Sequence, residues 1–288
     1  MINLIFFGSS DYSVIILKKL LEIKDFNVLA VFTKSDKPVG RKQEIIPNPV
    51  ADFARQNKLD LFQPEEFDNN LTSKIRKLKP DLGLVVAFGP PYFTQEMIDI
   101  PKFKIVNIHP SPLPKYRGAT PGPWQIINGE TTTAVTFFQI DALPDHGPII
   151  TQLPFEITSD ETATSFYQKA FNLASDNLEN ILKSYISNPT NIVEQNHTQK
   201  SYFPKFTKDS AQIDWNWDIQ KIDRFVRSLN PWPTAWTFVK NQQDQTLKMK
   251  IISSSIVKNE FIPNEVQIEG KTKNNWQEIG KYYRILKN

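Results

Sequence analysis

The sequence predicts an α/β fold with a mostly parallel sheet, followed by a small β domain. Short apolar runs alternate with helix-like segments through the first half of the chain, as in sheets whose parallel strands are joined by helices. The run 82–87 is apolar throughout, which is typical of a strand buried on both faces. Several short strand-like runs occupy the last third, and these predict the separate β domain.

The first half of the chain supplies most of the predicted sheet. Five apolar runs are predicted strands: 3–7, 27–32, 59–62, 82–87 and 104–108. Three segments between them have helical spacing: 13–23, 50–57 and 71–78. An open parallel sheet of this kind binds ligands beyond the carboxyl ends of its strands, so the loops after these strands are where we expect a functional site.

The second half begins by continuing this sheet. Strands at 132–139 and 149–157 and a long helix at 162–185 are predicted to complete the first domain. After a polar stretch, the chain has a predicted helix and then three short predicted strands: 219–228, then 234–239, 247–253 and 265–268. We therefore expect a catalytic domain over residues 1–187, a linker over 188–206 and a small domain over 207–288.

Composition limits the chemistry that the chain can use. The 288 residues include no cysteine, which excludes disulfides, thiolate metal sites and a cysteine nucleophile. Only three histidines are present, so no metal site is expected. Neither a signal peptide nor a membrane-spanning run is evident, and we expect a cytoplasmic protein. The net charge of +3 permits a nucleic-acid partner without requiring one.

Asn107, His109 and Asp145 are the strongest candidate catalytic residues. Asn107 and His109 lie two residues apart at the end of the predicted strand 104–108. A carboxylate favours the charged form of a neighbouring imidazole, and an asparagine amide can donate to an oxygen that gains negative charge. This set suits acyl transfer, and without a nucleophilic serine motif or cysteine we expect direct attack by an amine. The alternative is that His109 only ends a strand and caps a turn.

The motif Asn107-Ile-His-Pro-Ser-Pro-Leu-Pro-Lys-Tyr-Arg-Gly118, with Asp145-His-Gly-Pro-Ile149, resembles the signature of enzymes that transfer formyl from 10-formyltetrahydrofolate to an amino group. The resemblance implies a Rossmann-like catalytic domain. It also implies that Asn107 binds the formyl oxygen and that His109 stabilises the oxyanion and relays a proton. Asp145 would hold His109 charged and help to deprotonate the amine.

The same resemblance implies which residues contact the folate. These are Ser111, Pro112, Leu113, Pro114, Phe88, Gly89 and Asp141. The family usually has a glycine in the loop before the catalytic aspartate, whereas this chain has Asp141-Ala-Leu-Pro there, so backbone contacts with the folate are expected to differ. The folate is the formyl donor, and no metal is implied.

Segments 6–12, 31–41 and 230–236 resemble the branch of this family that formylates methionyl-tRNA for translation initiation. The resemblance implies that Lys37, Arg41 and Lys42 bind the tRNA, with Arg41 matching an arginine of the basic loop. An ordinary solvated loop is the alternative for these cations. The expected partners are initiator methionyl-tRNA and folate, with no membrane, and the protein is expected to be a monomer.

The predicted size of the small domain is compatible with formyl acceptors other than methionyl-tRNA. We identify three or four strands in it, whereas a full oligonucleotide-binding (OB) barrel has five, so a reduced OB-like domain is expected. A formyltransferase acting on an amino-sugar nucleotide is therefore the main alternative. A formyltetrahydrofolate hydrolase is a weaker alternative, because such hydrolases usually carry an N-terminal regulatory domain, which we do not expect here. A non-catalytic RNA- or folate-binding module is also a weaker alternative, because a binding role does not need all three candidate catalytic residues.

Overall fold

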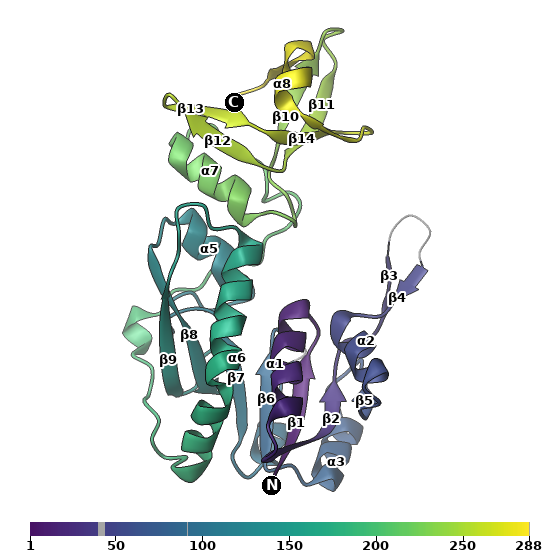
Figure 1. The fold of residues 1–288 in the computed structure, drawn as a ribbon, viewed down its shortest axis with the longest axis vertical. Coiled ribbons are helices and arrows are strands. Elements are labelled where there is room, and N and C mark those ends of the chain that lie inside the picture. Colours follow the sequence, from purple (N-terminus) through teal and green to yellow (C-terminus); the bar gives the residue numbers. More distant parts are fainter. Residues whose placement is uncertain (40–43, 91, 288) are drawn as a thin grey trace. The chain divides into compact units, whose positions relative to one another are not determined.

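The computed structural model describes residues 1–39, 44–90 and 92–287, which form two compact units (Figure 1). Unit 1 comprises Met1–Gly118, Ala134–Phe155 and Gln168–Tyr202. Unit 2 comprises Ala119–Thr133, Glu156–Tyr167 and Phe203–Asn288. Residues 119–133 and 156–167, which the sequence analysis places within a domain over 1–187, thus group with the C-terminal part of the chain.

A seven-stranded sheet forms the centre of unit 1, in the order β5-β2-β1-β6-β7-β8-β9. Its strands are β1 (Ile2–Gly8), β2 (Phe26–Phe32), β5 (Leu61–Phe62), β6 (Leu82–Val86), β7 (Ile105–His109), β8 (Thr132–Gln139) and β9 (Ile149–Glu156). The strands from β5 to β7 are parallel, and β8 pairs antiparallel with β7. The prediction of a mostly parallel sheet is therefore confirmed.

Helices cover this sheet, and Figure 1 shows α1 lying across β1 and β6. The helices are α1 (Asp11–Glu22), α2 (Pro49–Gln56), α3 (Asn69–Leu78), α4 (Gln95–Asp99), α6 (Ala163–Ser187) and the short 3-10 helix η1 (His197–Gln199). In the core, the ring of Phe7 on β1 stacks on the ring of Phe32, with centroids 4.7 Å apart, and contacts the ring of Phe93 edge-on, with centroids 4.8 Å apart. Within the described ranges, no helix has the length and apolar character to cross a membrane.

A small hairpin follows β2, where the sequence analysis expects only a loop (Figure 1). It consists of β3 (Lys37–Val39) paired antiparallel with β4 (Glu44–Ile46). Asp36, at its base, accepts hydrogen bonds from Arg55 at 2.8 Å and from Gln63 at 2.7 Å. Lys37 is exposed on β3. The other two residues expected to bind tRNA, Arg41 and Lys42, lie outside the described residues.

Unit 2 contains a five-stranded antiparallel sheet, in the order β15-β14-β11-β10-β16, and a separate hairpin. The strands are β10 (Trp236–Asn241), β11 (Thr246–Ile251), β14 (Glu265–Ile268), β15 (Lys273–Asn275) and β16 (Tyr283–Ile285), with β12 (Ser254–Val257) and β13 (Glu260–Pro263) in the hairpin. The prediction of three or four strands in this domain is wrong, since the described residues of unit 2 form the five strands of the sheet and the two of the hairpin. The strands that the sequence did not indicate are β12, β13, β15 and β16, which span only three or four residues each. The small β domain itself is confirmed.

Helices complete the core of unit 2. They are α5 (Pro121–Ile127), α7 (Ile219–Ser228), α8 (Trp276–Ile279) and the 3-10 turn η2 (Gly280–Tyr282). Ile222 and Phe225 of α7 are buried with Ile127 of α5 and Met249 of β11 in one apolar cluster. The Asp218 carboxylate caps α7 by accepting a hydrogen bond from the Lys221 amide at 2.7 Å.

Candidate active site

Strand β7 places Asn107 and His109 on the same face, because side chains alternate along a strand. Asn107 is paired in register with Phe138 of β8, and His109 with Thr136. Asn107 is half-buried, and within the described ranges no protein group forms a hydrogen bond with its side-chain amide. The carboxyl end of β7 therefore presents an amide donor that the fold leaves available to a ligand.

His109 is buried and both of its ring nitrogens face protein groups. Its Nε2 lies 3.0 Å from the backbone carbonyl of Tyr116. A carbonyl can only accept a hydrogen bond, so this contact places a proton on Nε2. Its Nδ1 lies 3.7 Å from the Asp145 carboxylate, which is longer than a hydrogen bond but close enough for an ion pair. These two contacts fix the plane of the ring and set a carboxylate beside Nδ1.

Asp145 is held in a turn that brings its carboxylate toward His109. The backbone amide of Gly118 donates to Asp145 Oδ2 at 2.8 Å. Asp145 itself has a φ of +51°, a left-handed conformation that aspartate tolerates better than most residues. A Cβ at Gly147 would collide with the backbone carbonyl of Gln139, so the close packing of this turn requires glycine there. The structure thus brings together the His109 and Asp145 side chains that the sequence singles out.

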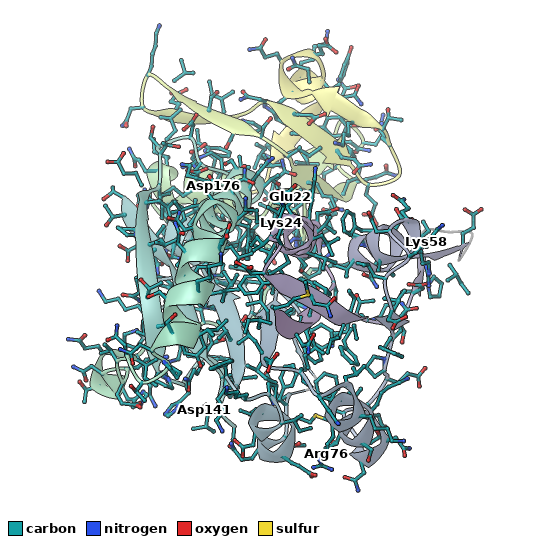
Figure 2. All side chains as sticks on the ribbon, turned by 60° about the horizontal axis from the view of Figure 1, so that its bottom comes forward. Glu22, Lys24, Lys58, Arg76, Asp141 and Asp176 are labelled. Carbon is teal, nitrogen blue, oxygen red and sulfur yellow. The ribbon has the colours of Figure 1, made fainter. Side chains whose placement is uncertain are left out.

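A second histidine–aspartate pair lies beside the first. Asp141 Oδ2 is 2.6 Å from His146 Nδ1, and Asp141 lies at the periphery of unit 1 (Figure 2). The His146 ring stacks on the His197 ring, with centroids 4.0 Å apart. Burial lowers the pKa of His197, and the nearby His146 and Arg117 lower this pKa further. All three histidines of the sequence therefore belong to the surroundings of Asp141 and Asp145.

Arg117 is a buried cation at the centre of this region. Its Nη2 donates to Gln195 Oε1 at 2.6 Å and lies 2.8 Å from His197 Nδ1. Burial lowers the pKa of Arg117, while the charges of Asp145 and Asp141 act in the opposite direction. Sequence reasoning missed Arg117, Gln195, His146 and His197 as parts of the site. Two of these residues had a local signal: His146 directly follows Asp145, and Arg117 lies in the motif that begins at Asn107. Gln195 and His197 had none, because their contacts with the site join distant segments.

The proline-rich loop after His109 is held from inside. The buried Ser111 donates through its hydroxyl to the Lys115 carbonyl at 2.8 Å, so this hydroxyl shapes the loop. Leu113 is buried, and its carbonyl accepts from the Gln152 amide at 2.9 Å. Pro112 and Pro114 are half-buried. Of these four expected folate contacts, the two prolines are the more accessible to a ligand.

The remaining expected folate residues lie in three different settings. Phe88 is buried in the aromatic core, where its ring lies 5.8 Å from that of Phe7 and 4.1 Å from the Lys34 ammonium. Gly89, directly after it, has a φ of +69° with open space where a Cβ would be. Its backbone is therefore the part of this pair that a ligand can approach. Asp141 is the partner of His146, as described above.

Matches to two protein-family models define the class of this protein. Residues 1–182 match the family described as formyl transferase, and residues 205–275 match the formyl transferase C-terminal domain. The first region holds Asn107, His109 and Asp145, and the second holds the strands β10, β11, β14 and β15 of the antiparallel sheet of unit 2. The chain belongs to the formyl transferase family, whose members are enzymes.

Similar sequences and similar solved structures give a more detailed comparison. The methionyl-tRNA formyltransferase of Alkaliphilus oremlandii (strain OhILAs) is 34% identical over 267 residues, covering 92% of this chain and 84% of that protein. The solved methionyl-tRNA formyltransferase from Clostridium thermocellum matches with a TM-score of 0.65 and 16% identity, over 93% of this chain and 99% of that chain. The N-formyltransferase from Helicobacter canadensis, solved with folinic acid and dTDP-3-aminofucose, matches with a TM-score of 0.66 and 22% identity, over 93% and 95%. At these identities, the two solved structures establish a shared fold.

Proposed function

We propose that this protein transfers the formyl group of 10-formyltetrahydrofolate to the amino group of methionyl-tRNA in the cytoplasm, preparing initiator tRNA for translation. The observation that carries this proposal is the His109–Asp145 pair beside the available Asn107 amide at the end of β7. The methionyl-tRNA formyltransferase of Alkaliphilus oremlandii supports the choice of acceptor, because its similarity extends over both units.

In this reaction the side chains of β7 stabilise charge and Asp145 moves a proton. The acceptor nitrogen bonds to the formyl carbon, the bond from that carbon to the folate nitrogen breaks, and one proton passes from the acceptor to the released folate. The Asn107 amide donates to the formyl oxygen as negative charge develops on it. Asp145 accepts the proton, directly or through water. His109 Nε2 already donates to the Tyr116 carbonyl, so it must share or leave this bond to donate to the formyl oxygen.

Substrate contacts are proposed for the residues around this centre. Pro112, Pro114, the Gly89 backbone and Asp141 would line the folate, while the buried Ser111, Leu113 and Phe88 would support these contacts from beneath. Lys37, Arg41 and Lys42 would bind phosphates of the tRNA, because lysine and arginine side chains are common partners of the phosphates of a nucleic-acid backbone. Of these three residues, Lys37 lies within the described part of the chain and is exposed.

The proposal is tested by an acceptor assay. Purified protein is incubated with 10-formyltetrahydrofolate and, in turn, charged initiator tRNA, an amino-sugar nucleotide and no acceptor. We expect formylation of methionyl-tRNA and neither sugar formylation nor formate release. Formylation of the sugar alone would assign the protein to the amino-sugar enzymes. Formate release without acceptor would indicate a hydrolase, and no turnover under any condition would indicate a binding module.

A further inference from the structure

The segment 193–202, which the sequence analysis treats as part of a linker, lies along the loops of the active site. The backbone of Val193 exchanges two hydrogen bonds of 2.8 Å with Ile149, directly after the turn that holds Asp145. At the other end of the segment, the Arg117 amide donates to the Ser201 carbonyl at 2.9 Å. The segment 193–202 therefore contacts both the loop after β7 and the turn before β9.

Gln195 connects this segment to the backbone of the aspartate turn. Its side chain is buried, with 4% of the residue exposed. The Gln195 Nε2 amide donates to the carbonyl of Asp145 at 3.1 Å and to that of Gly147 at 2.8 Å, while Oε1 accepts from Arg117. Both amide protons and the carbonyl oxygen are thus in use. These bonds fix the backbone on either side of His146 and so set the direction of the Asp145 carboxylate.

Ser201 holds the second partner of His109. Its hydroxyl accepts a hydrogen bond from the Tyr116 amide at 2.9 Å. The carbonyl of the same residue, Tyr116, is the group that faces His109 Nε2. One short segment therefore supports the carbonyl at Nε2 through Ser201 and the carboxylate at Nδ1 through Gln195.

We propose that Gln195 and Ser201 are positioning residues for formyl transfer, which orient His109 by holding its two partners. The proposal rests on the proposed function, in which His109 and Asp145 act on the substrate. Gln195 and Ser201 act through Asp145 and Tyr116 and do not contact the reacting atoms. Catalytic groups misplaced by about 1 Å can lose about 100-fold in rate, so loss of these bonds should slow the reaction step more than it weakens binding.

The first test replaces the amide of Gln195 by an apolar group of similar length. Gln195→Met should lower kcat by roughly 10- to 100-fold and leave KM for each substrate within about threefold, because the substrates do not touch this side chain. Gln199→Met is the matched control, since Gln199 is exposed in the same segment. It should retain wild-type kcat. A folded Gln195→Met enzyme with wild-type kcat would overturn the proposal for Gln195.

The second test uses a conservative pair at Ser201. Ser201→Ala removes the acceptor for the Tyr116 amide, whereas Ser201→Thr keeps a hydroxyl there. We expect kcat to fall in the alanine variant and to recover in the threonine variant, at similar melting temperatures. Equal kcat in the alanine variant and the wild type would remove Ser201 from the positioning role.

A spectroscopic readout separates this inference from the proposed function. The chain has three histidines, so its imidazole 15N signals can be assigned by replacing them one at a time. In the absence of substrate, Gln195→Met and Ser201→Ala should each shift the His109 ring signals, and Gln199→Met should not. Unmoved His109 signals in both variants would overturn the inference. A wild-type protein without formyl transfer to any acceptor would instead overturn the proposed function, whatever the spectra show.

Discussion

At the scale of single residues, the environment of His109 is almost entirely protein. Its ring is buried, and the groups facing its two nitrogens come from the loop after β7 and from the turn before β9. A buried ring cannot rely on bulk water to stabilise a change in its charge. The state of His109 during a reaction therefore depends on Asp145 and on the Tyr116 carbonyl.

The Asp145→Asn substitution tests this dependence. The amide keeps the size of the side chain but removes its negative charge and its capacity to accept a proton from the amine. We expect kcat to fall by about 10²- to 10⁴-fold, as for loss of a general base, with a melting temperature close to that of the wild type. Steady-state kinetics and thermal unfolding measure the two quantities. Activity within a few-fold of the wild type would show that Asp145 is not the base.

His197 gives a prediction about pH. Its pKa lies below the ordinary value of 6.5 because of burial and because His146 and Arg117 are nearby. The unfolded chain therefore binds this proton at a higher pH than the folded chain does. As pH falls, the stability of the fold begins to decrease near 6.5 and stops decreasing once the pH is below the pKa of His197 in the folded chain. His146→Phe should raise the pKa of His197, since one group that lowers it is removed. An NMR titration checks this, and an unchanged or lower pKa contradicts it.

The sequence marks the candidate catalytic residues more clearly than the residues that hold them in place. Asn107, His109 and Asp145 stand out because their chemistry and their motif are local in the sequence. The contact between Arg117 and Gln195 joins positions 78 residues apart, and no periodicity or spacing announces it. The sequence does not distinguish a buried arginine from an exposed one. The hydrogen bonds around Asp145 can therefore be identified only in the folded structure.

At the scale of elements, length decided which predictions held. Strands and helices with several turns or pleats, such as β1, β8, α6 and α7, lie within a few residues of their predicted ranges. The strand β15 and the helix α4 have three and five residues, which is too short for a period of two or 3.6 to be recognised. The β3–β4 hairpin was missed for the same reason.

Helix α7 offers a test of capping. Asp218→Ala removes the carboxylate that accepts from the Lys221 amide, and we expect a loss of about 1 kcal/mol in the free energy of unfolding. Gln220→Ala, at an exposed position of the first turn, serves as the control and should change it by less than about 0.5 kcal/mol. Urea unfolding measures both variants. Equal stabilities for the two would show that the cap does not stabilise α7.

At the scale of the whole molecule, the net charge of +3 bears on the acceptor. A polyanionic tRNA displaces counterions when lysine and arginine bind its phosphates, so its affinity falls as salt rises. We expect KM for charged tRNA to rise steeply with salt concentration and KM for the folate donor to change much less. Initial rates at several salt concentrations measure both constants. An acceptor KM insensitive to salt would contradict tRNA recognition through phosphates.

The two units are interleaved along the chain, and no local sequence pattern indicates this interleaving. Residues 119–133 and 156–167 belong to unit 2, although residues of unit 1 flank them on both sides. Helix α5 has only seven residues and begins with Pro121-Gly-Pro, so its sequence indicates neither a helix nor its packing on α7. Domain boundaries inferred from linkers in sequence cannot describe such an arrangement.

This interleaving has a consequence for synthesis on the ribosome. All segments of unit 1 have been made once residue 202 is complete, whereas α5 needs partners from the last third of the chain. Ile127 and Arg224, which are joined by a hydrogen bond, are 97 residues apart. At the usual rate of translation that separation takes on the order of ten seconds. During this interval the apolar face of α5 has no partner on α7, so a nascent chain halted there exposes it to other proteins.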